Sequence, residues 1–180
     1  MSEPRTTNGV PPSTGDATGV GEAFPGSDPS LPSVNEMLRE YKAHLTTVYP
    51  QDVWGYFQIA SNEKGKIELD IGHDGGYTQF IITTKIGEEC KLEVDIAVYI
   101  DTNTVCVDVI PVNTWPMSLC AGCAKLNKEA LLLLLQKLID GPTMSPAEIV
   151  SCLAAIVSED DVDVTYLKFP LYYLADTLEV

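Results

Sequence analysis

The sequence predicts an α+β domain: an antiparallel four- to five-stranded meander sheet with helices packed on one face. Apolar and polar residues alternate with a period of two between Val53 and Val112, and short turns separate the alternating runs. An apolar stripe at helical spacing precedes this region (34–48), and two apolar segments with helix-capping residues follow it (127–140 and 146–157). Short turns between alternating strands imply antiparallel neighbours, so we expect one sheet face to pack on the three helices and the other to meet water.

The N-terminal residues 1–33 differ in composition from the rest of the chain. They hold six of the twelve prolines, many Gly, Ser and Thr residues and few large apolar side chains. Such a segment cannot bury enough apolar surface to offset the entropy lost on ordering. We therefore expect a disordered tail over residues 1–33 and a single α+β domain over residues 34–180.

The first predicted helix begins at Ser33. Ser33 and Glu36 have the spacing of a capping box, in which each side chain satisfies a backbone amide of the other residue. Pro50 ends the helix. The apolar stripe follows the helical period and consists of Val34, Met37, Leu38, Tyr41, Leu45 and Val48.

The alternating region predicts five strands. In the clearest one, Ile67, Leu69 and Ile71 point to one side and Glu68 and Asp70 to the other. The same pattern predicts strands over residues 54–59, 77–86, 92–100 and 105–109, joined by glycine- or Asn/Asp-containing turns.

The C-terminal third is predicted to be mainly helical. Asn127 can cap a helix that runs to Asp140, and a serine–proline pair at 145–146, followed by Glu148, is typical of a helix start. Alternation at positions 162, 164 and 166 suggests a last short strand, and residues 171–178 suggest a terminal helical turn or arm.

Charge and composition exclude several classes of function. The chain carries 11 Lys and Arg against 26 Asp and Glu, a formal net charge of −15, which argues against nucleic-acid and anionic-membrane binding. No apolar run approaches the roughly 20 residues of a membrane span, and the N-terminus lacks the pattern of a signal peptide. The five cysteines form an odd set, so we expect reduced thiols and a cytoplasmic or nuclear protein.

The sharpest local motif is the Cys-x-x-Cys pair of Cys120 and Cys123. The stretch 107–126, which contains Trp115 and this pair, resembles the thioredoxin-like proteins over some twenty residues, and Pro170 could correspond to a later proline of that family. That resemblance implies thiol–disulfide exchange. The spacing of Trp115 and the preceding run of alternating strands depart from that family. The sequence therefore favours cysteines in a tight turn packed on the core over redox catalysis. A zinc site completed by other Cys or His residues is a further alternative: Cys90, Cys106, Cys152, His44 and His73. We expect no cofactor.

The strongest candidate for a binding site is the outward face of the sheet. Five acidic residues share its polar phase: Glu68, Asp70, Glu93, Asp95 and Asp108. Lys66, Lys85 and Lys91 compensate these charges only in part. Like charges on neighbouring strands are destabilising, so a face that carries them suits a basic partner, while a merely solubilising role is the alternative.

The order of the elements loosely resembles the RWD domain, an adaptor module of ubiquitin-conjugating-enzyme ancestry, over residues 34–157. Residues 45–50 look like the end of that family's first helix, but the Tyr-Pro-x-x-x-Pro turn expected after its third strand is missing. Secretion-chaperone-like and viral matrix-like folds have similar orders, so we assign the chain to no family.

The sequence therefore favours a non-enzymatic adaptor or assembly module that binds a protein partner through the acidic face, a sheet edge or the tail. The alternatives are a thiol–disulfide oxidoreductase and a viral assembly protein. Homo-oligomers are a further expectation, because five aromatic residues are not all expected to fit in the core: Trp54, Tyr56, Trp115, Tyr172 and Tyr173.

Overall fold

The computed structural model describes residues 33–88, 90–112, 119–159 and 163–180. The predicted tail therefore lies outside the described residues except for Ser33. The strands are β1 (Phe57–Asn62), β2 (Gly65–Ile71), β3 (Tyr77–Ile86), β4 (Cys90–Tyr99), β5 (Thr104–Pro111) and β6 (Cys120–Lys125). The helices are α1 (Val34–Val48), α2 (Lys128–Asp140), α3 (Pro146–Ala155) and α4 (Thr165–Leu178).

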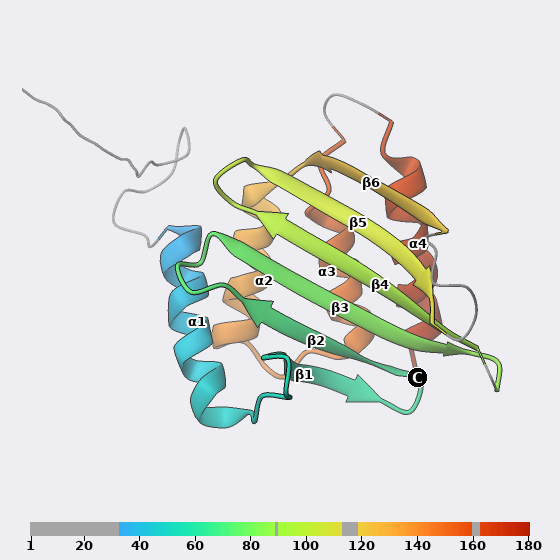
Figure 1. Cartoon of the computed structure of the whole chain (residues 1–180), viewed down its shortest axis with the longest axis horizontal. Coiled ribbons are helices and arrows are strands. Elements are labelled where there is room, and N and C mark those ends of the chain that lie inside the picture. Colours follow the sequence, from blue (N-terminus) through green and yellow to red (C-terminus); the bar gives the residue numbers. More distant parts are fainter. Residues whose placement is uncertain (1–32, 89, 113–118, 160–162) are drawn as a thin grey trace, which may run out of the picture.

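The six strands form one antiparallel sheet in chain order, from β1 at one edge to β6 at the other. All four helices lie against the same face of this sheet (Figure 1). The predicted α+β meander is therefore confirmed, with a sixth strand and a fourth helix in addition. The face turned away from the helices is covered by none of the described elements, and we call it the open face.

The core fills the space between the sheet and the helices. One phase of each central strand is buried, and the leucine stripes of the helices pack against it. The strand residues include Ile67, Leu69, Ile71, Phe80, Ile82, Val94, Ile96, Val98, Val105, Val107 and Val109, and the helix residues include Leu38, Leu45, Leu131, Leu134, Ile149 and Leu153.

Capping residues set the starts of the first three helices as the sequence predicts. The hydroxyls of Ser33 and Ser145 accept hydrogen bonds from the amides of Glu36 and Glu148, and both glutamates close the capping box by accepting from the serine amides. Asn127 caps α2 by accepting from the Ala130 amide. These bonds satisfy amides that have no partner within the helix.

The prediction of a turn around the Cys-x-x-Cys motif is wrong, because Cys120–Lys125 forms strand β6. Its side chains alternate between the two faces: Ala124 is buried on the helix side, whereas Ala121 and Cys123 are exposed. Gly122 also faces the helices, where a Cβ atom would lie 2.5 Å from the Tyr166 hydroxyl and 3.2 Å from Leu167. The missing side chain lets α4 approach the edge strand closely.

The predicted short strand at 162–166 is also wrong. Residue 162 lies outside the described residues, Val164 is the N-cap of α4, and Thr165 and Tyr166 are already helical. The predicted helical turn at 171–178 is the second half of this helix. The residues that pack α4 on the core have helical spacing: Leu167, Leu171, Leu174 and Leu178. This spacing determines the structure of the segment, rather than the apparent alternation at positions 162, 164 and 166.

Helix α4 contains Pro170, which has no amide hydrogen to give to the carbonyl of Tyr166 four residues earlier. The Cys120 thiol of β6 donates to that carbonyl instead, with Sγ 3.2 Å from the oxygen. The buried Lys168 also holds α4 in place, because its Nζ donates to the Val157 carbonyl and pairs with Glu159 at 2.7 Å.

In the part of the chain that the structure describes, no helix is both long and apolar enough to cross a membrane.

Candidate functional site: the open face of the sheet

The structure places all five predicted acidic residues on the open face. Antiparallel register sets Asp95 of β4 directly opposite Asp108 of β5, and Ile81 of β3 opposite Asp95 on the other side. Glu68 of β2 continues the same row beside Ile81. Glu93 lies two residues from Asp95 on β4 and therefore projects from the same face. We call Glu68, Asp70, Glu93, Asp95 and Asp108 the acidic face.

The centre of the acidic face is electrostatically unfavourable. Oδ1 of Asp95 and Oδ1 of Asp108 are both buried and have no hydrogen-bond partner among the described residues. Burial, a side-chain hydrogen bond with Glu93 and the negative charges of Glu93 and Asp108 raise the pKa of Asp95 to about 8. Asp95 is therefore mostly protonated at neutral pH. The acidic face accordingly carries less negative charge than five ionised carboxylates would give it.

Lysines relieve the negative charge mainly at one end of the open face. Lys66 forms an ion pair with Glu68 at 3.4 Å. Lys85 and Lys91 lie opposite each other near the β3–β4 turn, and both are exposed. Within the described residues, neither Asp95 nor Asp108 forms an ion pair.

The opposite end of the open face carries three tyrosines, which the sequence alone does not mark as a group. Tyr77 and Tyr99 are directly paired across β3 and β4, and their ring centroids are 5.2 Å apart. Tyr56 joins them through Gln79, whose Oε1 accepts hydrogen bonds of 3.1 Å from the hydroxyls of both Tyr56 and Tyr77. We call Tyr56, Tyr77, Tyr99 and Gln79 the tyrosine cluster. Its sequence signal was the outward phase of Tyr77 and Tyr99, but their pairing depends on the register.

Asp70 is the member of the acidic face that borders the tyrosine cluster. It pairs with Gln79 across β2 and β3. Burial raises the pKa of Tyr56 and of Tyr77, and negative charges that include Asp70 and Asp95 add to the effect in both. The two hydroxyls therefore stay protonated over the ordinary pH range and act as hydrogen-bond donors to Gln79.

Cys106 and Cys123 form a disulfide across β5 and β6, with their Cα atoms 4.0 Å apart. The expectation of reduced thiols throughout the chain is therefore wrong for this pair, whereas Cys90, Cys120 and Cys152 are free. The two joined residues occupy directly opposite positions on the open face. Counting cysteines could not reveal this pairing, because it requires β6 to be recognised as a strand.

The predicted redox pair of Cys120 and Cys123 is not brought together. The two residues are three apart on a strand, so their side chains lie on opposite faces of the sheet. Cys120 contacts α4 and Cys123 contacts Cys106. A thioredoxin-like pair needs both sulfurs at a helix N-terminus, and here neither lies there. The described residues also contain no group of three or more His, Cys, Asp and Glu side chains able to hold a metal ion.

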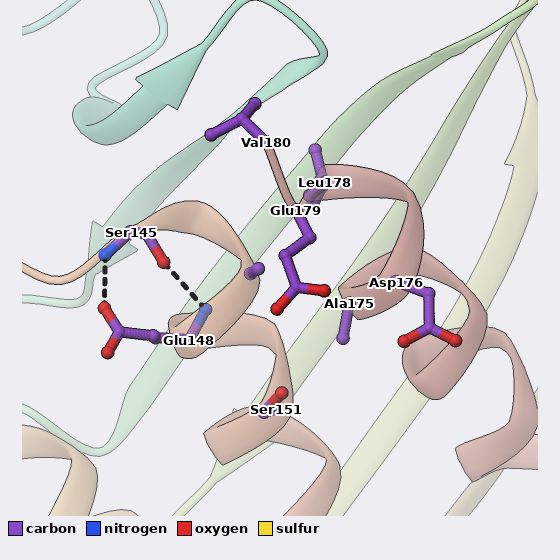
Figure 2. A pocket seen from close by; sticks show the side chains of 9 residues that line it. Ser145, Glu148, Ser151, Ala175, Asp176, Leu178, Glu179 and Val180 are labelled. Atoms are coloured by element: carbon purple, nitrogen blue, oxygen red, sulfur yellow. Dashed lines mark hydrogen bonds between the residues drawn. The ribbon is translucent and has the colours of Figure 1, made fainter.

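A pocket of about 340 Å³ lies on the helix side, between the start of α3 and the end of α4. Figure 2 shows that the Glu148 carboxylate points back to Ser145, where it completes the capping box of α3. The hydrogen bond from the Ser145 amide lowers the pKa of Glu148, as expected for a carboxylate engaged in this cap. Asp176 and Glu179 also line the pocket, together with apolar groups. The Glu148 carboxylate and the Ser145 hydroxyl thus have a structural role in the cap of α3.

Several large aromatic side chains are exposed, as the sequence predicts. Trp54 is 80% exposed in the turn before β1, and Tyr172 and Tyr173 are about half exposed on the outer side of α4. Tyr56 is half-buried in the tyrosine cluster. Trp115 lies outside the described residues.

None of the family models, curated proteins or solved structures with which the chain was compared gives a match.

Proposed function

We propose that this chain is a non-enzymatic protein-interaction module whose open face binds a basic partner. The observation that carries the proposal is the pairing of Asp95 with Asp108, beside Glu93, on a sheet face that the helices leave uncovered. In the free protein, the burial of Asp95 beside the negative charges of Glu93 and Asp108 keeps Asp95 protonated. A partner that places positive charges among these three groups lets Asp95 ionise and gains charge-assisted hydrogen bonds.

The local environment makes such contacts stronger than on an ordinary surface. The carboxylates lie among Ile81, Ala97 and Ile110, which reduce the access of water. Electrostatic interactions strengthen as the effective dielectric constant falls. Because Asp95 is mostly protonated in the free protein, binding of a cation is expected to release a proton from it.

The proposal is tested by calorimetric titration of the full chain with an arginine- and lysine-rich peptide at several salt concentrations. We expect the affinity to fall as salt rises, because salt screens exposed charges. Glu93→Lys should weaken binding about tenfold or more at low salt, since it replaces an attraction by a repulsion.

Glu129→Lys is the matched control, because Glu129 is exposed on α2 in the helix layer and the charge change is identical. It should leave most of the affinity intact. Absence of binding by the wild-type chain, or equal losses in the two variants, would overturn the proposal.

A further inference from the structure

The tyrosine cluster and Asp70 together offer a surface whose chemistry suits a cation. The hydroxyl hydrogens of Tyr56 and Tyr77 are directed to Gln79, so the outward lone pairs of both oxygens remain acceptors. The Asp70 carboxylate adds further acceptors beside Gln79. The paired rings of Tyr77 and Tyr99 add aromatic faces, and Tyr99 is 40% exposed.

We propose that the tyrosine cluster and Asp70 bind an arginine side chain of the basic partner, so that this site deepens the proposed function and rests on it. A guanidinium group has five N–H donors and no acceptor, which complements a surface of acceptors. Its flat face also stacks on aromatic rings, which the compact ammonium of lysine cannot do equally well.

The charge of Asp70 orients the bound group. Asp70 lies on β2, directly opposite Gln79 of the tyrosine cluster. A cation bound to the cluster is therefore attracted to the β2 side. The arginine accordingly sits over β2–β4, at the end of the sheet remote from Lys85 and Lys91.

The geometry also sets the spacing between this site and the acidic centre. Tyr99 and Asp95 are four residues apart on β4, which corresponds to about 13 Å at roughly 3.3 Å per residue. The small side chain of Ala97 lies between them on the same face. A partner in extended conformation bridges the two places with basic residues at positions i and i+4.

The test uses three synthetic peptides with blocked ends and two basic positions separated by Ser-Gly-Ser. The first carries arginine at both positions, the second lysine, and the third citrulline, which keeps the planar shape without the charge. Calorimetric titration of the wild-type chain should give an arginine affinity roughly two to five times that for lysine, the size of an exposed cation–π contribution. Citrulline should bind far more weakly than either.

Tyr99→Leu should abolish the preference for arginine over lysine. Tyr172→Leu is the matched control, because Tyr172 is also an exposed tyrosine but lies on α4 in the helix layer, and it should keep the preference. Tyr77→Leu provides a second variant if the first unfolds, and circular dichroism reports the fold. Glu93→Lys should weaken both charged peptides to a similar degree.

The outcomes separate this inference from the function on which it rests. An unchanged arginine preference in Tyr99→Leu, together with weaker binding in Glu93→Lys, would overturn the arginine site and leave the acidic face as the docking surface. If the wild-type chain binds neither charged peptide, both proposals are wrong.

Discussion

A single carboxyl group shows how the open face differs from an ordinary charged surface. Asp95 follows the outward phase of β4, which by itself predicts a solvated carboxylate. Its cross-strand partner Asp108 and its neighbour Glu93 turn the position into a half-buried acidic cluster. Alternation along one strand therefore places the residue on the correct face, whereas its raised pKa depends first on burial in the folded sheet, then on Glu93, and last on Asp108 of the neighbouring strand.

The raised pKa of Asp95 predicts a pH-dependent stability. In the unfolded chain the pKa of this group is near its ordinary value of 3.8, whereas in the folded protein its pKa is about 8. Between these values the folded state holds a proton that the unfolded state has lost, so the free energy of unfolding falls as the pH rises from about 4 to 8. Asp95→Asn should flatten this slope and stabilise the protein at pH 8 by about 1–2 kcal/mol, a value reduced for the screening of a half-exposed group.

Urea unfolding at pH 5, 6.5 and 8 measures this effect. Asp140→Asn is the matched control, because Asp140 is exposed at the end of α2 and its substitution should leave the slope unchanged. Parallel pH profiles for the wild-type chain and Asp95→Asn would show that Asp95 titrates normally.

At the scale of elements, α4 and β6 depend on each other. The proline inside α4 leaves the Tyr166 carbonyl without its helical donor, and the Cys120 thiol of β6 supplies a replacement. Gly122 of β6 in turn leaves room for Tyr166 and Leu167. The hydrogen bond that α4 lacks at its proline is thus supplied by β6. This edge strand itself has few residues that favour strand conformation.

This dependence predicts a coupling between Cys120 and Pro170. Cys120→Ala should lower the free energy of unfolding by about 0.5–1.5 kcal/mol, since it leaves the Tyr166 carbonyl without that donor. In the Pro170→Ala background, the new backbone amide can bond to the same carbonyl, so Cys120→Ala should have a smaller effect. A double-mutant cycle in urea should give an interaction energy of at least about 0.5 kcal/mol, and additivity within about 0.3 kcal/mol would contradict the exchange of donors.

The same two elements mark the limit of what the sequence could predict. Strands β2–β5 and helices α1–α3 were predictable because each has a strong apolar period and, in the helices, a capping residue. Strand β6 has a single buried side chain, Ala124, and its strand conformation is imposed by pairing with β5. Helix α4 was obscured by Pro170, whose tolerance depends on a thiol from another element.

The candidate site likewise contains features that single strands predict and features that depend on the pairing between strands. The five carboxylates could be assigned to one face from their phase in the strands alone. The tyrosine cluster and the disulfide could not, because the pairs Tyr77–Tyr99 and Cys106–Cys123 depend on the register between strands.

At the scale of the whole molecule, the arrangement of layers separates two roles. The helices cover one face of the sheet (Figure 1) and enclose the core with it, whereas the other face carries the acidic face and the tyrosine cluster. With a formal net charge of −15, the protein is expected to attract basic partners from a distance, and the open face then provides the local contacts. Neither role requires the pocket between α3 and α4.

The disulfide connects these two roles, because it fastens the edge strand of the sheet on the side where the partner is proposed to bind. Cys106 and Cys123 are separated by 17 positions, and closing a loop of that length stabilises a folded chain by about 3 kcal/mol in the chain-entropy model. Dithiothreitol should therefore lower the free energy of unfolding by about 2–3 kcal/mol and reduce hydrogen-exchange protection in β6 more than in β2–β4. The double variant Cys106→Ser, Cys123→Ser should resemble the reduced wild-type chain and should not respond to the reductant. If dithiothreitol leaves the wild-type unfolding curve unchanged, the two sulfurs are not joined in solution, and the sequence-based expectation of free thiols is correct for this pair as well.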